Sequence, residues 1–560
     1  MVYCGKASLG CQSCRTRRIK CDKVRPHCTQ CVRVGKQCPG YRDQLSLMFR
    51  DESTKVIQKA HAQWGVAESP ETGESSDLSP ASASSSASSN GSRAWMLDRA
   101  RHESLPPRDG HIVFLANMHG EIDATKIDKA VQFYIERYVI GLPDEPKVGQ
   151  ELQGKKWAHT PEIRDIMAAV GLASMSNLTG NKELYILARE QYGLALRHMA
   201  LSIRNSKGAL DLEVAMRMVV MLALFEMIRG RAQPITATAR THLMGGAALL
   251  KSVLPFIKSP ADGVRGLLQM CFSMLGSVQG SLQQLSTEPN VLIPTQASLS
   301  TTESLLPSTF FDWIEAGGSL NSTPDRPAAE LINMVTRFVQ LSISVRSRGF
   351  GDRQPKTTKM ITELLDLDGQ LEAWEHGQEG VWGFAEKKAD AGFFPPEAVL
   401  DGCYHVYKDM WAARVWNHYR WARIMSSQML LESVERFPKS SLPLVSAAQQ
   451  RLSLDTIARV ARDSLVSIPT HYRHPGLERA HCEYFDQTKG GAGIGAAGIP
   501  SLLFQIKVAG AAPGVPHHHR AWALAMLETI WANSGMFQAK ALAEMLYKAN
   551  DEHLVKEEPK

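Results

Sequence analysis

Residues 11–38 read CQSCRTRRIKCDKVRPHCTQCVRVGKQC, and this stretch decides the fold of the N-terminal region. It contains the spacing C-x2-C-x6-C twice, the second copy 17 positions after the first. The six cysteines are Cys11, Cys14, Cys21, Cys28, Cys31 and Cys38. Two cysteines separated by two residues can place both thiolates on one metal ion, and a third, six residues later, completes the set after a short helix. Because two tetrahedral Zn²⁺ ions need about eight metal–sulfur bonds, six thiolates suffice only if two of them bridge. The spacing therefore predicts a binuclear cluster of two zinc ions.

Two other interpretations fit the cysteines less well. A disulfide framework needs an oxidising compartment, and the N-terminus MVYCGKASLG lacks the apolar core of a secretion signal. A single site made from the first two cysteines of each repeat has acceptable spacing, but it leaves Cys21 and Cys38 without a role. The remaining cysteines have no partner at ligand spacing and are predicted to be buried or incidental thiols; they are Cys4, Cys271, Cys403 and Cys482.

Positive charge is concentrated in the same region. Residues 1–50 contain eleven Lys and Arg against two acids, Asp22 and Asp43, for a net charge of +9. The whole chain carries only +6, so residues 51–560 sum to −3. Such a concentration of charge around a metal scaffold is typical of a protein that binds a polyanion, and nucleic acid is the simplest partner.

The stretch CQSCRTRRIKCDKVRPHCTQCVRVGKQCPGY resembles the binuclear zinc-cluster DNA-binding domain of fungal transcription factors. The resemblance covers all six cysteines, the basic run before the third of them, Asp22 after it, and Pro26 in the connecting loop. It implies that Cys11 and Cys28 are the bridging thiolates, and that Pro26 turns the loop between two helical halves.

The same resemblance implies double-stranded DNA as the partner. The C-terminal end of the first helix would enter the major groove over a CGG-type triplet, where the family most often has a lysine at the position of Arg18. Arginine can contact guanine O6 and N7 in a bidentate manner, so we expect the preference for guanine to survive. The predicted phosphate contacts are Arg15, Arg17, Lys20, Lys23 and Arg33. The alternative for any one of them is a solvated side chain that makes no contact with DNA.

Residues 41–65 are compatible with a short helix. A coiled coil needs three or four heptads, and this stretch provides little more than two imperfect ones. A helix that packs on its own protein or on the DNA backbone is therefore favoured over a dimerisation zipper. A homodimer and a monomer bound to one triplet both stay open.

Residues 66–110 are predicted to form a disordered linker, and residues 1–10 and 551–560 to be disordered ends. From Glu68 to Ser92 the sequence is rich in serine, lacks aromatic residues, and has four acids and no basic residue. Such a segment cannot bury enough apolar surface to offset its conformational entropy. The linker separates a small zinc-organised two-helix module, residues 11–40, from the rest of the chain.

Residues 111–550 are predicted to form a large all-α domain. Thr160-Pro161-Glu162 is a helix start, with a hydroxyl N-cap and proline at the first helical position. The run from Val214 to Gly230 is apolar nearly all round and indicates a central helix, too short and too interrupted by charge for a membrane span. The segments KELYILAREQYGLALRHMALSI and MVVMLALFEMI resemble the fungal-specific helical regulatory domain, which implies an array of antiparallel helices.

Three further patterns are interpreted as structural. The sequence GIGAAG at residues 493–498 matches a dinucleotide fingerprint, but no buried strand precedes it, so we expect a loop. Residues 517–519 are adjacent histidines, which we expect to form a polar helix start and not to converge well on one metal. An aromatic helix is predicted to be core, with arginines stacking at its rim; its aromatic residues are Tyr404, Trp411, Trp416, Tyr419 and Trp421, and its arginines are Arg414, Arg420 and Arg423.

Together these features predict a nuclear, sequence-specific DNA-binding regulator of RNA polymerase II genes, acting on a metabolic pathway, with transcription machinery or co-regulators as protein partners. The alternative is a zinc-stabilised scaffold that binds nucleic acid without sequence preference. No catalytic motif stands in a recognisable context, so an enzyme is not expected. Near the C-terminus, Lys556 matches the short Ψ-K-x-E pattern of SUMO attachment, which needs an extended and exposed peptide.

Overall fold

The computed structural model describes part of the chain. In the N-terminal module it describes residues 11–17, 19–22, 28–35 and 38. In the remainder it describes residues 125–140, 159–205, 211–229, 235–254, 260–287, 306–321, 323–347, 352, 354–389, 394–478 and 499–557. The predicted helix at 41–65, the predicted linker at 66–110 and the glycine motif at 493–498 lie outside the described residues.

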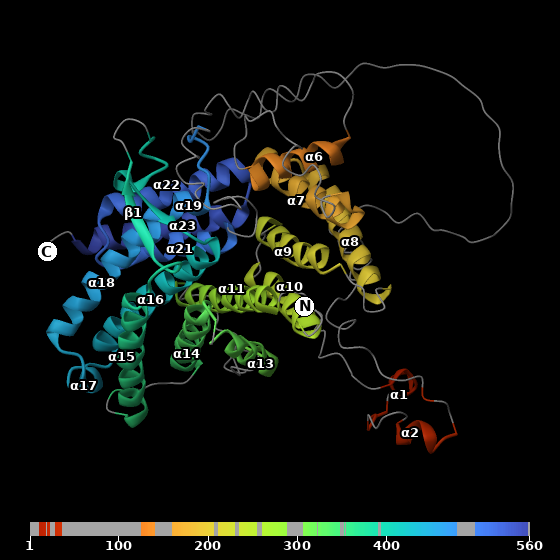
Figure 1. Ribbon diagram of the computed structural model, residues 1–560, viewed down its shortest axis with the longest axis horizontal. Helices are drawn as coiled ribbons and strands as arrows, with labels where there is room; N and C mark the ends of the chain where they lie inside the picture. The colour runs from red at the N-terminus through yellow and green to blue at the C-terminus, as the bar shows by residue number, and fades with distance from the viewer. Residues whose placement is uncertain are drawn as a thin grey trace. The chain divides into compact units, whose positions relative to one another are not determined.

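The N-terminal module contains two short helices, α1 (Gln12–Thr16) and α2 (Thr29–Val32) (Figure 1). Each helix begins directly after the first cysteine of a repeat, Cys11 or Cys28. The sequence repeat is therefore also a structural repeat, and the predicted two-helix module is confirmed.

The larger part of the chain, which we call the helical body, confirms the predicted helical fold (Figure 1). Its first helices are α6 (Lys126–Tyr134), η2 (Ile135–Ile140), α7 (Pro161–Thr179), α8 (Lys182–Asn205) and α9 (Leu212–Arg229). The middle group is α10 (Ile235–Val253), α11 (Pro260–Thr287), α13 (Ser308–Gly317), η5 (Gly318–Leu320), α14 (Arg326–Ser347) and α15 (Pro355–His376). The last group is α16 (Met410–Arg436), α17 (Pro438–Ser441), α18 (Ala447–Val466), α19 (Ile468–His471), α21 (Ile499–Ala511), α22 (His517–Ser534) and α23 (Phe537–Glu557).

Local sequence signals set the bounds of α7. Thr160 is the N-cap residue and Pro161 the first helical residue, as predicted, although the Thr160 side chain makes no capping hydrogen bond. The helix ends at Gly180, whose φ of 70° is accessible to glycine without strain and whose N–H donates to the carbonyl of Ser176.

The predicted central helix is α9. It buries residues on every side, including Val219, Leu222 and Phe225, each 0% exposed. Helices α7, α10 and α23 pack around it. An all-round apolar sequence requires such a position, because no face of the helix can be left to water.

A two-stranded antiparallel sheet was not predicted. Strand β1 (Phe384–Lys388) pairs with β2 (Cys403–Tyr407), with Phe384 opposite Tyr407. The turn before β2 includes the 3-10 helix η6 (Leu400–Gly402). Tyr404 therefore lies on β2, which corrects its predicted place on the aromatic helix: Asp409 accepts the N–H of Trp411 at 2.8 Å and starts α16 only there.

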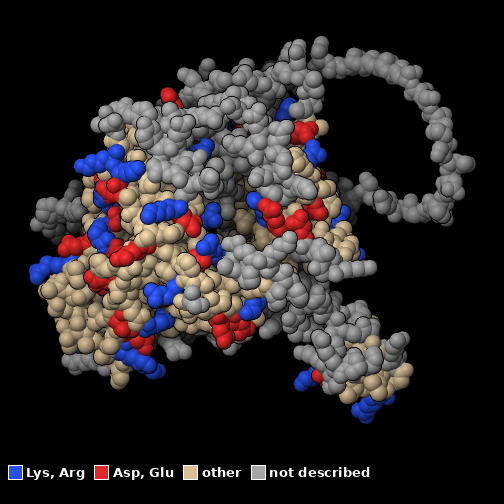
Figure 2. All heavy atoms as spheres, in the orientation of Figure 1, with Lys and Arg blue, Asp and Glu red and all other residues tan. Residues whose placement is uncertain are grey.

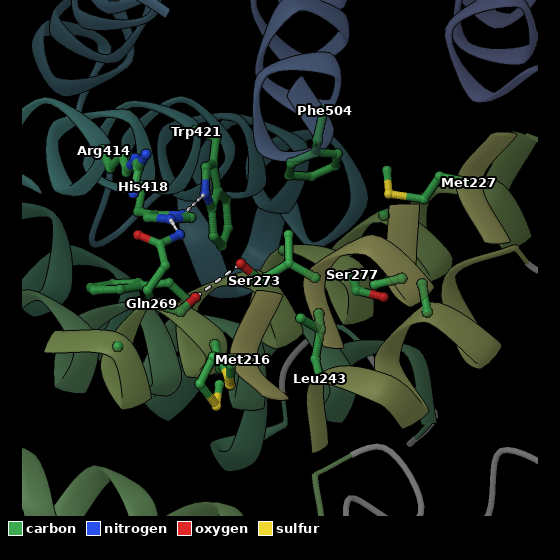
Figure 3. A pocket seen from close by; sticks show the side chains of 18 of the residues that line it. Met216, Met227, Leu243, Gln269, Ser273, Ser277, Arg414, His418, Trp421 and Phe504 are labelled. Carbon is green, nitrogen blue, oxygen red and sulfur yellow. Dashed lines mark hydrogen bonds between the residues drawn. The ribbon is translucent and has the colours of Figure 1, made fainter. Parts of the chain in front are cut away.

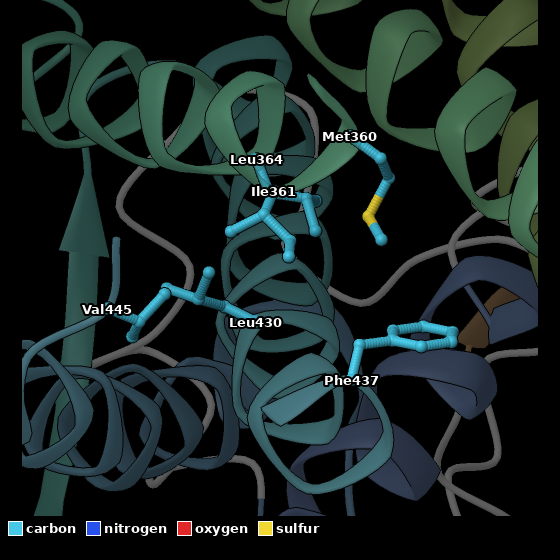
Figure 4. Packing of buried hydrophobic residues seen from close by; sticks show 6 residues of the cluster. All are labelled: Met360, Ile361, Leu364, Leu430, Phe437 and Val445. Carbon is cyan, nitrogen blue, oxygen red and sulfur yellow. The ribbon is translucent and has the colours of Figure 1, made fainter. Parts of the chain in front are cut away.

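Helix α16 forms the core against α14, α15, α18 and α21. Its aromatic side chains are buried as predicted; they are Trp411, Trp416, Tyr419 and Trp421. A hydrophobic cluster between α15 and α16 closes one end of this core (Figure 4), formed by Met360, Ile361, Leu364, Leu430, Phe437 and Val445.

Two arginines of α16 are buried, whereas the sequence predicted arginines at the rim. Arg420 and Arg423 are 1% and 2% exposed. Nη1 of Arg423 lies 2.7 Å from Oδ1 of Asp368 on α15, and Nη2 of Arg420 donates to the hydroxyl of Tyr407 on β2 at 2.7 Å. A guanidinium is tolerated in a core when other elements supply its acceptors, as they do here.

The first and last parts of the helical body are joined by hydrogen bonds, which we call the terminal seam. The hydroxyl of Tyr138 lies 2.8 Å from Oγ of Ser174 and donates to the carbonyl of Ser534, 396 residues later, at 2.8 Å. The side-chain amide of Asn177 donates to the carbonyl of Gly535 at 2.8 Å. Gly535 has a φ of 66°, and a Cβ atom there would lie 2.4 Å from the carbonyl oxygen of Ser174, so the seam requires glycine.

The C-terminal helix is longer than the sequence suggested. Helix α23 continues to Glu557, whereas a disordered tail was predicted from residue 551. Among the described helices, none combines the length and the apolar composition that a membrane span requires.

Candidate zinc and nucleic-acid site

The cysteine sulfur atoms of the N-terminal module converge. The Sγ atom of Cys28 lies 3.6 Å from that of Cys11 and 3.6 Å from that of Cys14, and the Sγ atoms of Cys11 and Cys31 are 3.7 Å apart. A tetrahedral zinc ion with bonds of about 2.3 Å places its ligand sulfurs about 3.8 Å from one another. The observed spacings therefore fit thiolates that share a zinc ion.

The sulfurs form two groups that overlap. The first group is Cys11, Cys14, Cys21 and Cys28, and the second is Cys11, Cys28, Cys31 and Cys38. Within each group the sulfur atoms all lie within 4.8 Å of one another, so each group could hold one metal ion. Cys11 and Cys28 belong to both groups.

The two short helices bring these sulfurs together. The N–H of Cys14 points to the sulfur of Cys11 at 3.4 Å, and the N–H of Cys31 donates to the carbonyl of Cys28 at 3.1 Å. The buried cluster of the module consists of cysteines alone among the described residues. Burial raises the pKa of the Cys28 thiol, so metal must displace its proton when it binds.

Asp22 links the two halves of the module. Its Oδ2 accepts the N–H of Thr29, at 3.1 Å, and also the hydroxyl of Thr29, at the first turn of α2. The sequence identified Asp22 only as part of a resemblance. Its position directly after the third cysteine gave no signal of this role, because the two partners are seven positions apart in the sequence.

Replacing Asp22 by Ala is expected to destabilise the zinc-bound module by about 1 kcal/mol, because loss of a helix-capping acceptor typically has that effect. The measurement is the chelator concentration that removes half of the zinc from the full-length chain, which should fall about fivefold. Asp43→Ala removes the same charge outside the cysteine repeats and should leave that concentration unchanged. Equal effects of the two variants would contradict a capping role.

The structure describes only some of the predicted DNA contacts. Arg17, Lys20 and Arg33 are exposed on the module, and basic side chains are visible on its surface (Figure 2). Arg15 lies on α1. Arg18 and Lys23 lie outside the described residues.

Two other predicted features differ in the structure. His518 and His519 do converge, contrary to expectation: their Nε2 atoms lie 3.4 Å and 2.8 Å from the two carboxylate oxygens of Asp401. Both histidines reach the same acid because it projects from the turn before β2, where its φ is 52°.

Lys556 lies within α23, so this end of the helix would have to unwind before the lysine could occupy an extended peptide.

Comparison with known proteins adds to this geometry. Residues 9–47 match the fungal Zn(2)-Cys(6) binuclear cluster domain. The chain is 51% identical over 56 residues to the aspercryptin biosynthesis cluster-specific transcription regulator atnN of Emericella nidulans, a match that covers 10% of this chain and 9% of the relative. It is 40% identical over 43 residues to the transcriptional regulatory protein moc3 of Schizosaccharomyces pombe, covering 8% of each. It is 56% identical over 42 residues to white-opaque regulator 2 of Candida albicans, covering 8% of this chain and 9% of the relative.

These matches span less than a tenth of the length of each relative. No solved structure matches the chain. Within the module, the matched range contains both overlapping sulfur groups. Residues 9–47 are therefore a fungal Zn(2)-Cys(6) binuclear cluster domain, a domain that binds zinc.

Proposed function

We propose that this chain is a nuclear, sequence-specific DNA-binding regulator of transcription by RNA polymerase II. The observation that carries the proposal is the pair of overlapping sulfur groups, placed in a segment with a net charge of +9. Two of the relatives are named as transcription regulators, in support of the same function.

Two zinc ions would be held by the six cysteines, with Cys11 and Cys28 as the bridging thiolates. Bound zinc supplies the folding free energy of so small a module. The protein's own contribution is to hold α1 and α2 together and to present the basic side chains around them. The helical body would receive regulatory input or bind co-regulators, and a homodimer is one form in which the chain could bind paired triplets.

The basic residues divide into two roles in this proposal. Arg17, Lys20 and Arg33 are exposed and charged, which suits contacts to DNA phosphates, and Arg15 and Lys23 would act in the same way. Arg18 would read guanine in a CGG-type triplet, because a guanidinium can donate to O6 and N7 of one base together.

Replacing Arg18 by Ala is expected to lower affinity for a CGG-containing duplex by about 1 to 3 kcal/mol, which is roughly 5- to 150-fold, and to relax sequence preference at that triplet. Fluorescence anisotropy with the CGG duplex and a scrambled duplex measures both effects. The matched variant Lys23→Ala removes the same charge, and should weaken binding to both duplexes equally while reducing the salt dependence by about one unit of slope.

If the two variants lower affinity for both duplexes alike, the protein reads no sequence through Arg18. The scaffold without sequence preference would then be the better description of the module.

A further inference from the structure

The helical body contains a partly open cavity of about 670 Å³ between α9, α10, α11, α16, α21 and α23 (Figure 3). Its walls are mostly apolar, with Met216 and Met227 from α9, Leu243 from α10 and Phe504 from α21. Cavities of this size and character hold small organic molecules in other proteins, whereas packed cores have few voids larger than a water molecule.

Small residues on α11 create this space. Ser273, Gly276, Ser277 and Gly280 line the cavity and lie on one face of the helix at intervals of three and four residues. A Cβ atom on Gly276 would meet no other atom within 4 Å. The cavity therefore has room for larger side chains that the sequence does not supply.

One end of the cavity carries hydrogen-bonding groups. The indole N–H of Trp421 donates to Nδ1 of His418 at 3.2 Å, and the imidazole stacks on Phe272 with ring centres 4.5 Å apart. Burial, and next the charge of Arg414, lowers the pKa of His418 to about 3, so its ring is neutral with the proton on Nε2. That Nε2 lies 3.4 Å from the side-chain nitrogen of Gln269 (Figure 3).

The side-chain amide of Gln269 has a hydrogen-bonding group to spare. The side-chain NH₂ of Gln269 and the Nε2–H of His418 are both donors and cannot bond each other. The amide orientation that fits a protonated Nε2 is therefore the flipped one, in which the Gln269 oxygen faces Nε2. Its NH₂ group then takes the position of the buried oxygen atom, which has no hydrogen-bond partner. This NH₂ group is then buried without an acceptor and has no surface exposed to the cavity.

Positive charge lines the same cavity. Arg414, one turn before His418, is largely buried, which lowers its pKa, whereas the nearby charge of Asp409 acts in the opposite direction; among the described residues its guanidinium has no direct hydrogen bond or ion pair. Lys507 is 8% exposed and also lines the cavity. The acid of the lining, Glu213, is bonded to Arg217 at 3.0 Å. Because a buried charge without a directly bonded acceptor is unfavourable, an anion placed beside Arg414 would stabilise the structure.

We propose that this cavity binds a hydrophobic carboxylic acid. Its carboxylate would lie at the polar end, accepting a hydrogen bond from Arg414, and its apolar part would lie among the methionine, leucine and phenylalanine side chains. The proposal rests on the cavity alone and is independent of whether the N-terminal module reads DNA.

Isothermal titration calorimetry of the full-length chain tests this site with dodecanoate and with dodecan-1-ol, which has the same chain length without the charge. We expect dodecanoate to bind with a stoichiometry of one and at least about tenfold more tightly than the alcohol, as a charge-assisted hydrogen bond in a buried site provides. Arg414→Gln should bring the two affinities together while leaving the alcohol affinity unchanged.

A second variant tests the location. Gly276→Leu fills the cavity without meeting the backbone, and should abolish binding of dodecanoate while the thermal unfolding midpoint is maintained. Gly369→Leu is the matched control, because Gly369 is an exposed residue within α15, a Cβ there also meets nothing within 4 Å, and it lies away from the cavity lining.

Three results would overturn the proposal: no saturable binding of dodecanoate, equal affinity for acid and alcohol in the unmodified chain, or binding that survives in both Arg414→Gln and Gly276→Leu. Since Arg414→Gln preserves much of the side-chain length, it keeps the test decisive if Gly276→Leu does not fold.

Discussion

Replacing Cys28 by Ala is expected to remove both zinc ions from the full-length chain and to weaken binding to specific DNA by about 10³-fold or more. The sulfur of Cys28 belongs to both four-cysteine groups, so its loss leaves each group with three thiolates. The module has no other described buried cluster to hold α1 and α2 in place. Zinc content by mass spectrometry and DNA affinity by anisotropy measure the two effects.

Cys271→Ala is the matched control for this experiment. Cys271 is equally buried but lies on α11 of the helical body, so the variant should keep two zinc ions per chain and full DNA affinity. One zinc ion in the unmodified protein, or a Cys28→Ala variant that still binds DNA specifically, would contradict a shared cluster.

Acid is expected to destabilise the helical body through three buried histidines. Burial lowers the pKa of His242 to about 4 and the pKa values of His418 and His471 to about 3. An unfolded histidine has a pKa near 6.5, so below that pH the unfolded chain binds protons that the native chain does not. The free energy of unfolding should therefore fall as pH decreases from about 6.5 toward 4, by about 1.4 kcal/mol per pH unit for each histidine.

Urea unfolding of the full-length chain, followed by circular dichroism, measures this effect. From pH 7.5 to pH 5 each of the three histidines should contribute a loss of about 2 kcal/mol. His242→Gln, which keeps a donor for the hydroxyl oxygen of Tyr192, whose own proton is donated to Glu226, should reduce the total loss by that amount. His376→Gln, at an exposed position, should not. An unfolding free energy that is constant over this range would show that these histidines do not remain neutral.

The zinc module could be predicted from sequence because its information is local. Six cysteines at fixed spacings between Cys11 and Cys38 leave few arrangements, and the overlap of the two sulfur groups at Cys11 and Cys28 follows the same logic. The start of α7 at Thr160 and Pro161 was predictable for a similar reason, since a helix start depends on neighbouring residues.

Features that depend on distant partners could not be predicted. The burial of Arg423 depends on Asp368, 55 residues away, and the convergence of His518 and His519 depends on Asp401, more than a hundred residues away. Strand β1, with the sequence FAEKK, has no strand signal of its own and forms because β2 offers it a partner. The cavity is a property of six helices together, and only the glycines of α11 hint at it.

The terminal seam determines when a newly made chain can finish folding. A ribosome synthesises Tyr138 and Ser174 long before it reaches Ser534 and Gly535, and the hydrogen bond from Tyr138 to Ser534 spans 396 residues. Until α22 has left the exit tunnel, the buried surfaces of η2 and α7 lack their final partner and remain available to chaperones or to aggregation. A premature stop codon shortly before Ser534 would thus yield a chain in which η2 and α7 never acquire their C-terminal partner. Buried surface would then be exposed at both ends of the domain, where chaperones and proteases could recognise it.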